Sequence, residues 1–166
     1  MPLKIGINGF GRIGRLVLRS LIEKPRKTIE VKLINSPSEF STQIHLLKFD
    51  STHRNIENKI KTGENWIDFG RGKINFLHEK DPKLINYKKY NIDLVMECSG
   101  KFNNKKYAEN HLKSGAKKVL FSAPVKNADI TSVFGVNHKD ILLRHKIISN
   151  ASCTTNALAP IIKVLD

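Results

Sequence analysis

Residues 4–15, KIGINGFGRIGR, decide how the rest of the sequence is interpreted. The run KIGIN has the length and apolar content of a buried strand, and residues 12–23 have the pattern of an amphipathic helix. The turn between them has the pattern GxGxxG, formed by Gly9, Gly11 and Gly14. A strand, a glycine turn and a helix in this order predict the start of a βαβ unit.

Each glycine of such a turn has a physical role. The first permits the tight turn, the second lets the backbone approach a pyrophosphate, and the third allows close packing of helix and strand. The helix N-terminus adds unpaired N–H groups, including those of Arg12 and Ile13. A glycine-rich turn without a ligand is the alternative, but the strand-turn-helix context favours dinucleotide binding.

The same motif places an acidic residue about twenty positions later, where it binds the adenosine ribose. This chain has Asn35-Ser36-Pro37 there, and Glu39 follows only in the next helical segment. A carboxylate repels a 2′-phosphate, whereas the hydroxyl of Ser36 can donate a hydrogen bond to one. NADP is therefore admissible as well as NAD.

Apolar runs of strand length alternate with helix-like segments along the remaining chain. This order predicts an α/β fold, a Rossmann-type doubly wound, mostly parallel sheet. An antiparallel hairpin is predicted at 58–80, because short alternating runs there flank Gly70 and Gly72. The further predicted strands are 29–35, 92–98, 117–123, 133–136 and 145–151, and the further predicted helices are 38–50 and 105–116.

Composition limits the function classes. The chain has 166 residues, of which 40% are hydrophobic, and this favours one domain. No run of about eighteen apolar residues and no signal peptide is present, so we expect a soluble, cytoplasmic protein without a membrane partner. The two cysteines lack metal-ligand spacing, so we expect neither a disulfide framework nor a metal site.

The net charge of +14 has two interpretations. A basic surface attracts nucleic acid or phosphorylated small molecules. The lysines are also scattered among many Asn and Ile residues, as an AT-rich coding sequence would produce. No RNA-binding signature with interleaved aromatic residues is present, so nucleic acid is not expected as a partner.

The octapeptide SNASCTTN, residues 149–156, places Cys153 among hydroxyl and carboxamide side chains after a β-rich segment. A helix is predicted to begin near Ser152, and a helix N-terminus with N–H and O–H donors favours the thiolate. Cys98, within the apolar run IDLVMEC, fits a buried structural cysteine. We therefore interpret Cys153 as a nucleophile, the alternative being an inert thiol.

GINGFGRIGR and SNASCTTN together resemble the glyceraldehyde-3-phosphate dehydrogenase family, and the resemblance extends over the whole chain. Six further segments lie in the family's order and spacing: DSTHR (50–54), EKDP (79–82), ECSGKF (97–102), GAKKV (115–119), SAPVKNAD (122–129) and FGVNH (134–138). The resemblance implies a dinucleotide-binding domain at 1–151 and the first helix of a catalytic domain at 152–166. It also implies a chain that is the front half of a longer, homotetrameric enzyme.

The resemblance further implies functional residues. Gly9, Phe10, Gly11, Arg12 and Ile13 would hold the pyrophosphate, Lys80 and Phe102 would flank the adenine, and Ser99, Gly100 and Ser122 would line the route to the nicotinamide. Cys153 would attack the aldehyde, while Ser152 and Thr154 would bind phosphate. The family's catalytic histidine lies beyond Asp166, and none of the six histidines here is in a matching motif, so each is interpreted as a surface or helix residue.

The implied reaction is the NAD(P)-dependent phosphorylating oxidation of glyceraldehyde 3-phosphate through a cysteine thioester, with inorganic phosphate as second substrate. Erythrose 4-phosphate is the alternative aldehyde. A non-catalytic dinucleotide-binding or RNA-binding module is the alternative from another functional class. Without the histidine, we expect the isolated chain to be inactive.

Overall fold

The computed structural model describes residues 1–57 and 59–166. Its strands are β1 (Leu3–Asn8), β2 (Ile29–Asn35), β3 (Lys61–Gly63), β4 (Trp66–Asp68), β5 (Ile74–Leu77), β6 (Leu94–Glu97), β7 (Lys118–Phe121), β8 (Ile130–Thr131) and β9 (Ile147–Ser149). Its α-helices are α1 (Arg12–Glu23), α2 (Phe40–Lys48), α3 (Lys105–Lys113) and α4 (Cys153–Leu165). Short 3₁₀ helices are η1 (Pro82–Leu84), η2 (Tyr87–Tyr90) and η3 (His138–Asp140).

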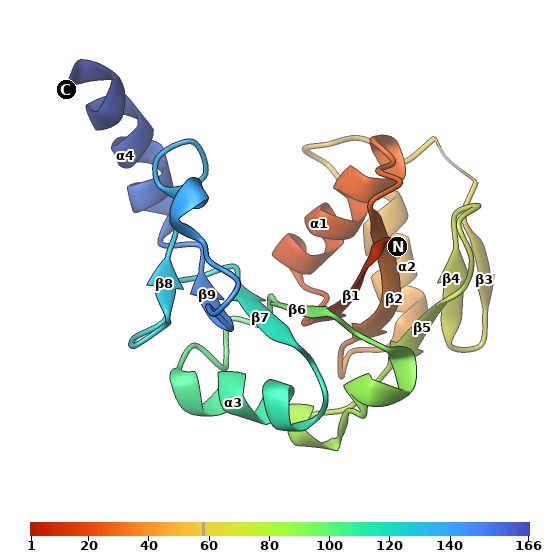
Figure 1. The fold of residues 1–166 in the computed structure, drawn as a ribbon. Coiled ribbons are helices and arrows are strands. Elements are labelled where there is room, and N and C mark those ends of the chain that lie inside the picture. Colours follow the sequence, from red (N-terminus) through yellow and green to blue (C-terminus); the bar gives the residue numbers. More distant parts are fainter. Residues whose placement is uncertain (58) are drawn as a thin grey trace.

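The strands form one sheet, which among the described residues has the order β3-β4-β5-β2-β1-β6-β7-β9-β8 (Figure 1). Every neighbouring pair is parallel except that β4 runs antiparallel to both β3 and β5. The predicted Rossmann-type sheet with an inserted antiparallel hairpin is therefore confirmed.

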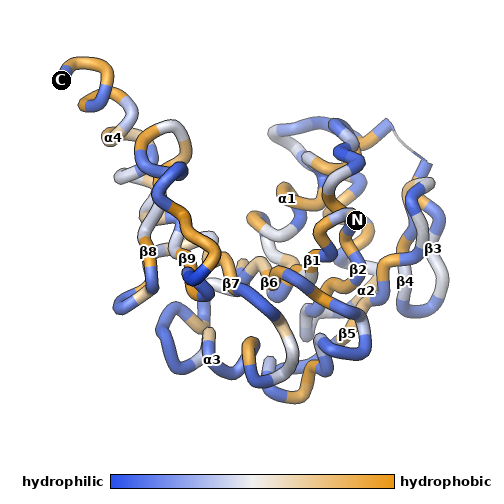
Figure 2. The backbone as a smooth tube through the Cα atoms, viewed as in Figure 1, coloured by the Kyte–Doolittle hydropathy of each residue, from blue (hydrophilic) through white to orange (hydrophobic). Residues whose placement is uncertain are grey.

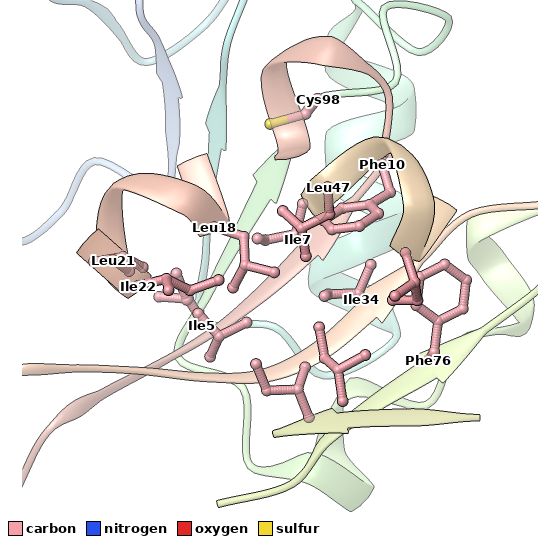
Figure 3. Close-up of a cluster of buried hydrophobic side chains, with 14 residues drawn as sticks. Ile5, Ile7, Phe10, Leu18, Leu21, Ile22, Ile34, Leu47, Phe76 and Cys98 are labelled. Atoms are coloured by element: carbon pink, nitrogen blue, oxygen red, sulfur yellow. The ribbon is translucent and has the colours of Figure 1, made fainter. Parts of the chain in front are cut away.

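Helices cover both faces of the sheet, which explains why its central strands are apolar runs rather than alternating ones. Helices α1 and α2 lie on one face and α3 on the other (Figure 1). Leu33 and Ile34, adjacent on β2, belong to the two different hydrophobic clusters, as the two-residue period of a strand requires. In the first cluster Leu18 of α1 is fully buried among strand residues such as Ile7 (Figure 3).

The order in which the chain adds strands to the sheet reverses between β1 and β6. From β1 the chain continues to β2 and β5 on one side, and from β6 to β7 and β9 on the other. Ligands of open α/β sheets bind at such a switch point, beyond the carboxyl ends of the strands. The topology therefore predicts a ligand site at the segments that follow β1, β2, β5 and β6.

Some predicted element bounds differ from the structure. The helix predicted at 38–50 is shorter, because Glu39 caps α2 and Phe49 is already extended. The hairpin predicted at 58–80 contains β3 and β4, with β5 returning parallel to β2; Asn58 lies outside the described residues. The strand predicted at 133–136 is wrong: these residues form a turn, and the strand of this segment is β8.

Helix α4 projects from the sheet at one end of the molecule (Figure 1). It has no buried residue, and Leu158, Ile161, Ile162, Val164 and Leu165 are each more than half exposed. Figure 2 shows hydrophobic stretches along α4 near the C-terminus, away from the covered strands. Over residues 1–57 and 59–166, no helix combines the length and apolar character needed to span a membrane.

Candidate dinucleotide site and cysteine

A cleft of about 370 Å³ lies beyond the carboxyl ends of β1, β2, β5 and β6, at the switch point. Four short segments line it, one following each strand. The lining residues are Asn8–Gly11, Asn35–Ser38, Glu79–Lys80, Cys98–Ser99 and Lys101–Phe102. The structure thus brings together seven of the predicted cofactor residues, namely Gly9, Phe10, Gly11, Ser36, Lys80, Ser99 and Phe102.

The glycine turn has the close contacts that its sequence predicts. Gly9 has φ +90°, and a Cβ there would lie 2.4 Å from the backbone of Ser99. A Cβ on Gly14 would lie 2.1 Å from the carbonyl oxygen of Gly9. Gly11 is different, because its φ is −73° and no atom lies within 4 Å of an added Cβ. No contact among residues 1–57 and 59–166 requires glycine at position 11, so the glycine of the motif fits a ligand that approaches the backbone there.

Helix α1 begins directly after Gly11. Its N-terminus has no side-chain cap, and its first turn has no acidic residue. The other α-helices of the described chain are capped by Glu39, Asn104 and Ser152. Arg15 holds the turn in place, since its guanidinium donates to the carbonyl oxygen of Phe10 at 2.9 Å. The first turn of α1 therefore presents backbone N–H groups to an anion.

Three predicted pyrophosphate residues, Phe10, Arg12 and Ile13, differ in what they present to a ligand. The side chain of Phe10 is 1% exposed and packs edge to face on Phe76, so only its backbone can meet a ligand (Figure 3). Ile13, in contrast, is 47% exposed, and Arg12 is exposed beside it. Arg12 and Ile13 belong to the first turn of α1 rather than to the wall of the cleft.

Ser36 occupies the end of β2, where the motif usually has an acid. It is 4% exposed, and its hydroxyl oxygen accepts a hydrogen bond from the Ser38 amide at 3.4 Å, which leaves its proton free to donate. Glu39 does not line the cleft. Its carboxylate accepts from the backbone N–H groups of Ser41 and Thr42, and bonds to these two residues lower its pKa to about 2.

The loop after β6 forms another wall of the cleft. Ser99 and Phe102 line the cleft, and the ring of Phe102 packs on Tyr107 with centroids 4.8 Å apart. Gly100 has φ +71° within the loop but is not in the lining. Ser122, after β7, is also outside the lining, and its hydroxyl donates to the carbonyl oxygen of Glu97.

Sequence analysis missed Asn8 and Asn35, whose side chains lie at the base of the cleft. Both residues are buried, and Asn35 donates through Nδ2 to Oδ1 of Asn8 at 2.8 Å. The signal was present, because each asparagine ends an otherwise apolar strand. A polar residue at the carboxyl end of a buried parallel strand indicates a site as well as a turn.

Cys153 is exposed at the first position of α4. The helix is capped by Ser152, whose hydroxyl accepts from the Thr155 N–H at 3.0 Å and lies 3.0 Å from the hydroxyl of Thr154. Because α4 follows β9, a parallel neighbour of β7, the cysteine lies at the same edge of the sheet as the cleft. The predicted hydroxyl surroundings and helix N-terminus are both present.

Cys98 has the opposite environment, as predicted. It is 8% exposed within the first hydrophobic cluster, and burial raises the pKa of its thiol to about 12. Its thiol therefore stays protonated and unreactive at physiological pH.

Of the six histidines, each expected to be a surface or helix residue, one is a helix residue that is buried. His111 is on α3 but is fully buried, with Nδ1 2.9 Å from the hydroxyl of Tyr87 and Nε2 2.9 Å from Oε2 of Glu97. The other five are not in the buried set.

Comparison with known proteins agrees with this geometry. Residues 3–105 match the family model described as the NAD-binding domain of glyceraldehyde 3-phosphate dehydrogenase. The chain belongs to the glyceraldehyde 3-phosphate dehydrogenase family. It carries the family's NAD-binding domain, and the matched range contains all four segments that line the cleft.

Curated members of the family are similar over the whole chain. It is 46% identical to a glyceraldehyde-3-phosphate dehydrogenase from Xanthobacter flavus over 166 residues, all of this chain and 50% of that protein. Identity is 47% to the enzyme from Cereibacter sphaeroides and 46% to that from Thermotoga maritima, covering 99% and 98% of this chain and 49% of each relative. The chain thus spans about half the length of these relatives.

Proposed function

We propose that the protein represented by this chain catalyses the NAD(P)-dependent, phosphorylating oxidation of glyceraldehyde 3-phosphate to 1,3-bisphosphoglycerate. Residues 1–151 form its dinucleotide-binding domain, and residues 152–166 begin its catalytic domain. The observation that carries the proposal is Gly11, whose Cβ position is open space, at a helix N-terminus without a side-chain cap. The relatives cited above are named for glyceraldehyde 3-phosphate, so erythrose 4-phosphate is not favoured.

The glycine turn and the first turn of α1 bind the pyrophosphate. The open face of Gly11 lets the phosphates approach, and the backbone N–H groups of Phe10, Arg12 and Ile13 are the donors. Gly9 supports them by allowing the turn to pack against Ser99.

The wall after β2, β5 and β6 binds the adenosine. Lys80 and Phe102, which face the cleft from two different segments, flank the adenine. Ser36 meets the ribose, and its free hydroxyl proton tolerates a 2′-phosphate where an aspartate would repel it. Lys101 adds a positive charge on the lining. These contacts support use of NADP as well as NAD.

Ser99, Gly100 and Ser122 lie along the carboxyl ends of β6 and β7, between the adenosine side and the strand that leads to Cys153. We assign them the route to the nicotinamide. When bound, the nicotinamide accepts the hydride that the oxidation releases.

Cys153 supplies the nucleophile. Its thiolate adds to the aldehyde carbon to form a thiohemiacetal, which becomes a thioester on loss of a hydride and the hydroxyl proton. Inorganic phosphate then attacks the thioester carbonyl, and the C–S bond breaks to release the acyl phosphate and the thiolate. Ser152 and Thr154, whose hydroxyls lie on either side of the cysteine in sequence, bind phosphate next to it.

The family resemblance alone supports two further parts of the proposal, a homotetramer of the longer protein and a cytoplasmic location. The excess of lysine is assigned to attraction of anionic substrates and cofactor rather than of RNA.

The substitution Gly11→Ala tests the proposal. Its methyl group meets no protein atom, so the free energy of unfolding should change by less than about 1 kcal/mol. The Kd for NAD, measured by calorimetry, should rise about tenfold or more, because the methyl group occupies the space of close backbone approach. Gly9→Ala is the contrast, since its methyl group meets the Ser99 backbone and should prevent folding. Unchanged NAD affinity in Gly11→Ala would refute the assigned site.

A further inference from the structure

A buried polar cluster lies beneath the cleft, and the proposed function does not use it. Its centre is Glu97, the last residue of β6, whose side chain is 0% exposed. Oε1 accepts a hydrogen bond from the Ser99 N–H at 2.8 Å. Oε2 accepts from Nδ2 of Asn8 at 2.6 Å and lies 2.9 Å from Nε2 of His111. The carboxylate is therefore bonded to three separate parts of the chain.

The hydrogen bonds continue from Asn8 across the sheet. Oδ1 of Asn8 accepts from Nδ2 of Asn35 at 2.8 Å, and the same Nδ2 donates to the carbonyl oxygen of Glu79 at 3.0 Å. Oδ1 of Asn35 accepts from the Glu79 N–H at 2.9 Å. These residues end β6, β1 and β2 and follow β5, which are four adjacent strands of the sheet. One continuous chain of hydrogen bonds thus joins every segment that lines the cleft.

The charge of Glu97 determines the direction of these bonds. An ionised carboxylate only accepts, so Asn8 must turn its NH₂ group toward Glu97 and its oxygen toward Asn35. Asn35 must then present its own NH₂ group to Asn8 and its oxygen to the Glu79 amide. A glutamine at position 97 has one oxygen and one NH₂ group, so either the Ser99 N–H or the donors of Asn8 and His111 would face a group that cannot accept, and the Asn8 end of the chain would no longer be held.

Tyr87 and His111 complete the other side of the cluster. Burial and the charge of Glu97 raise the pKa of the Tyr87 hydroxyl, so the phenol keeps its proton. Its O–H can donate to Nδ1 of His111, which leaves the Nε2–H to donate to Glu97. This arm points away from the cleft, since neither Tyr87 nor His111 lines it.

We propose that Glu97 is a positioning residue of the dinucleotide site: its buried carboxylate holds the Ser99 amide and orients the Asn8–Asn35–Glu79 chain, so that the four walls of the cleft are preformed. The inference rests on the proposed binding of a dinucleotide at this cleft. The hydrogen bond from the Ser99 N–H to Glu97 has two effects. It holds the loop after β6, and it fixes the backbone against which Gly9 packs. Glu97 reaches the ligand only through these residues.

The test compares Glu97→Gln with Tyr87→Phe, which removes only the hydroxyl at the far end of the same cluster. For each variant we would measure thermal unfolding, the Kd for NAD by calorimetry, and amide hydrogen exchange by NMR without ligand. Glu97→Gln should raise the Kd about tenfold and speed exchange at Ser99 and Glu79. Tyr87→Phe should lower the melting temperature but leave the Kd within about twofold and both amides protected.

The outcomes separate this inference from the proposed function. If the unaltered chain does not bind NAD, the proposed function fails, and amide exchange still decides the role of Glu97. Unchanged protection of Ser99 and Glu79 in Glu97→Gln would overturn the inference, as would a Kd in Tyr87→Phe that rises as much as in Glu97→Gln.

If Glu97→Gln does not fold, Asn8→Ala takes its place. This variant breaks the chain toward Asn35 but keeps the bond from Ser99 to Glu97. Exchange should then become faster at Glu79 and stay slow at Ser99. Equal protection of the two amides would overturn the inference.

Discussion

The proposed use of NADP as well as NAD depends on one residue, Ser36. It lies at the end of β2 with a hydroxyl proton free to donate, and the nearest carboxylate in sequence, that of Glu39, caps α2. In the proposed site, the segment directly after β2 therefore offers the hydroxyl of Ser36, rather than a carboxylate, to the 2′ position of the adenosine ribose. A change of charge at position 36 therefore tests the preference between NAD and NADP.

We expect the chain to bind NADP at least about as well as NAD. Ser36→Asp should create a preference for NAD of tenfold or more, about 1.4 kcal/mol, because its carboxylate repels the 2′-phosphate. Calorimetric titration of both cofactors measures this preference. Ser36→Asn, which has the same shape without the charge, is the matched control and should keep the Kd ratio near that of the unaltered chain. A tenfold preference for NAD before any substitution would contradict the prediction.

At the level of elements, the start of α4 and the end of β6 place the two cysteines in opposite environments. Cys153 is exposed at the first residue of α4. Cys98 is buried, and burial raises the pKa of its thiol to about 12. Limiting iodoacetamide between about pH 6 and pH 9 should therefore label Cys153 well before Cys98, because Cys153 is accessible while burial keeps the thiol of Cys98 protonated.

Peptide mass spectrometry locates the label. Unfolding in denaturant is the control, since it exposes both thiols and should make their labelling equal. Equal labelling of the folded chain would show that Cys153 has no advantage as a nucleophile. Thr155→Val leaves Cys153 unchanged while removing a hydroxyl beside the Ser152 cap, and it should alter the rate only slightly.

The elements also show what can be predicted from sequence. The bounds of α1 and β2 were predicted correctly, because strong periodicity and a glycine turn define them locally. The segment VFGV was wrongly predicted as a strand. Gly135 adopts φ +86°, and the Asn137 side chain accepts from the Val133 N–H, so local polar contacts form a turn despite the apolar residues.

The candidate site was predictable where its residues act through the backbone. The spacing of the motif identifies Gly9, which needs a positive φ, and Gly11, whose backbone is open to a ligand. The role of Glu97 could not be recognised, because it depends on Asn8, which is 89 positions away in sequence and is brought next to it only by the sheet order. His111 is similar, since its burial depends on packing against Tyr87 and Glu97 rather than on its helix alone.

In the whole molecule, the cleft is surrounded by other parts of the chain, whereas the helix that carries the nucleophile is not. The cleft is closed by four segments that are tied together by hydrogen bonds, whereas α4 has no buried residue. The chain spans about half the length of its cited relatives. Dinucleotide binding and catalysis should therefore be separable in this chain.

We expect the 166-residue chain to bind the dinucleotide but to lack efficient turnover. His138 and His145, on the segment before β9, accept from the backbone N–H groups of Gly135 and Leu142, so neither ring is poised to take a proton from Cys153. A general base typically contributes about a hundredfold to ten-thousandfold to the rate. Assays of aldehyde oxidation, with phosphate and either cofactor, should give rates far below the roughly 1–1,000 s⁻¹ of complete enzymes. The Cys153→Ser variant sets the background, and a rate of complete-enzyme size that this substitution abolishes would show that the chain contains its own base.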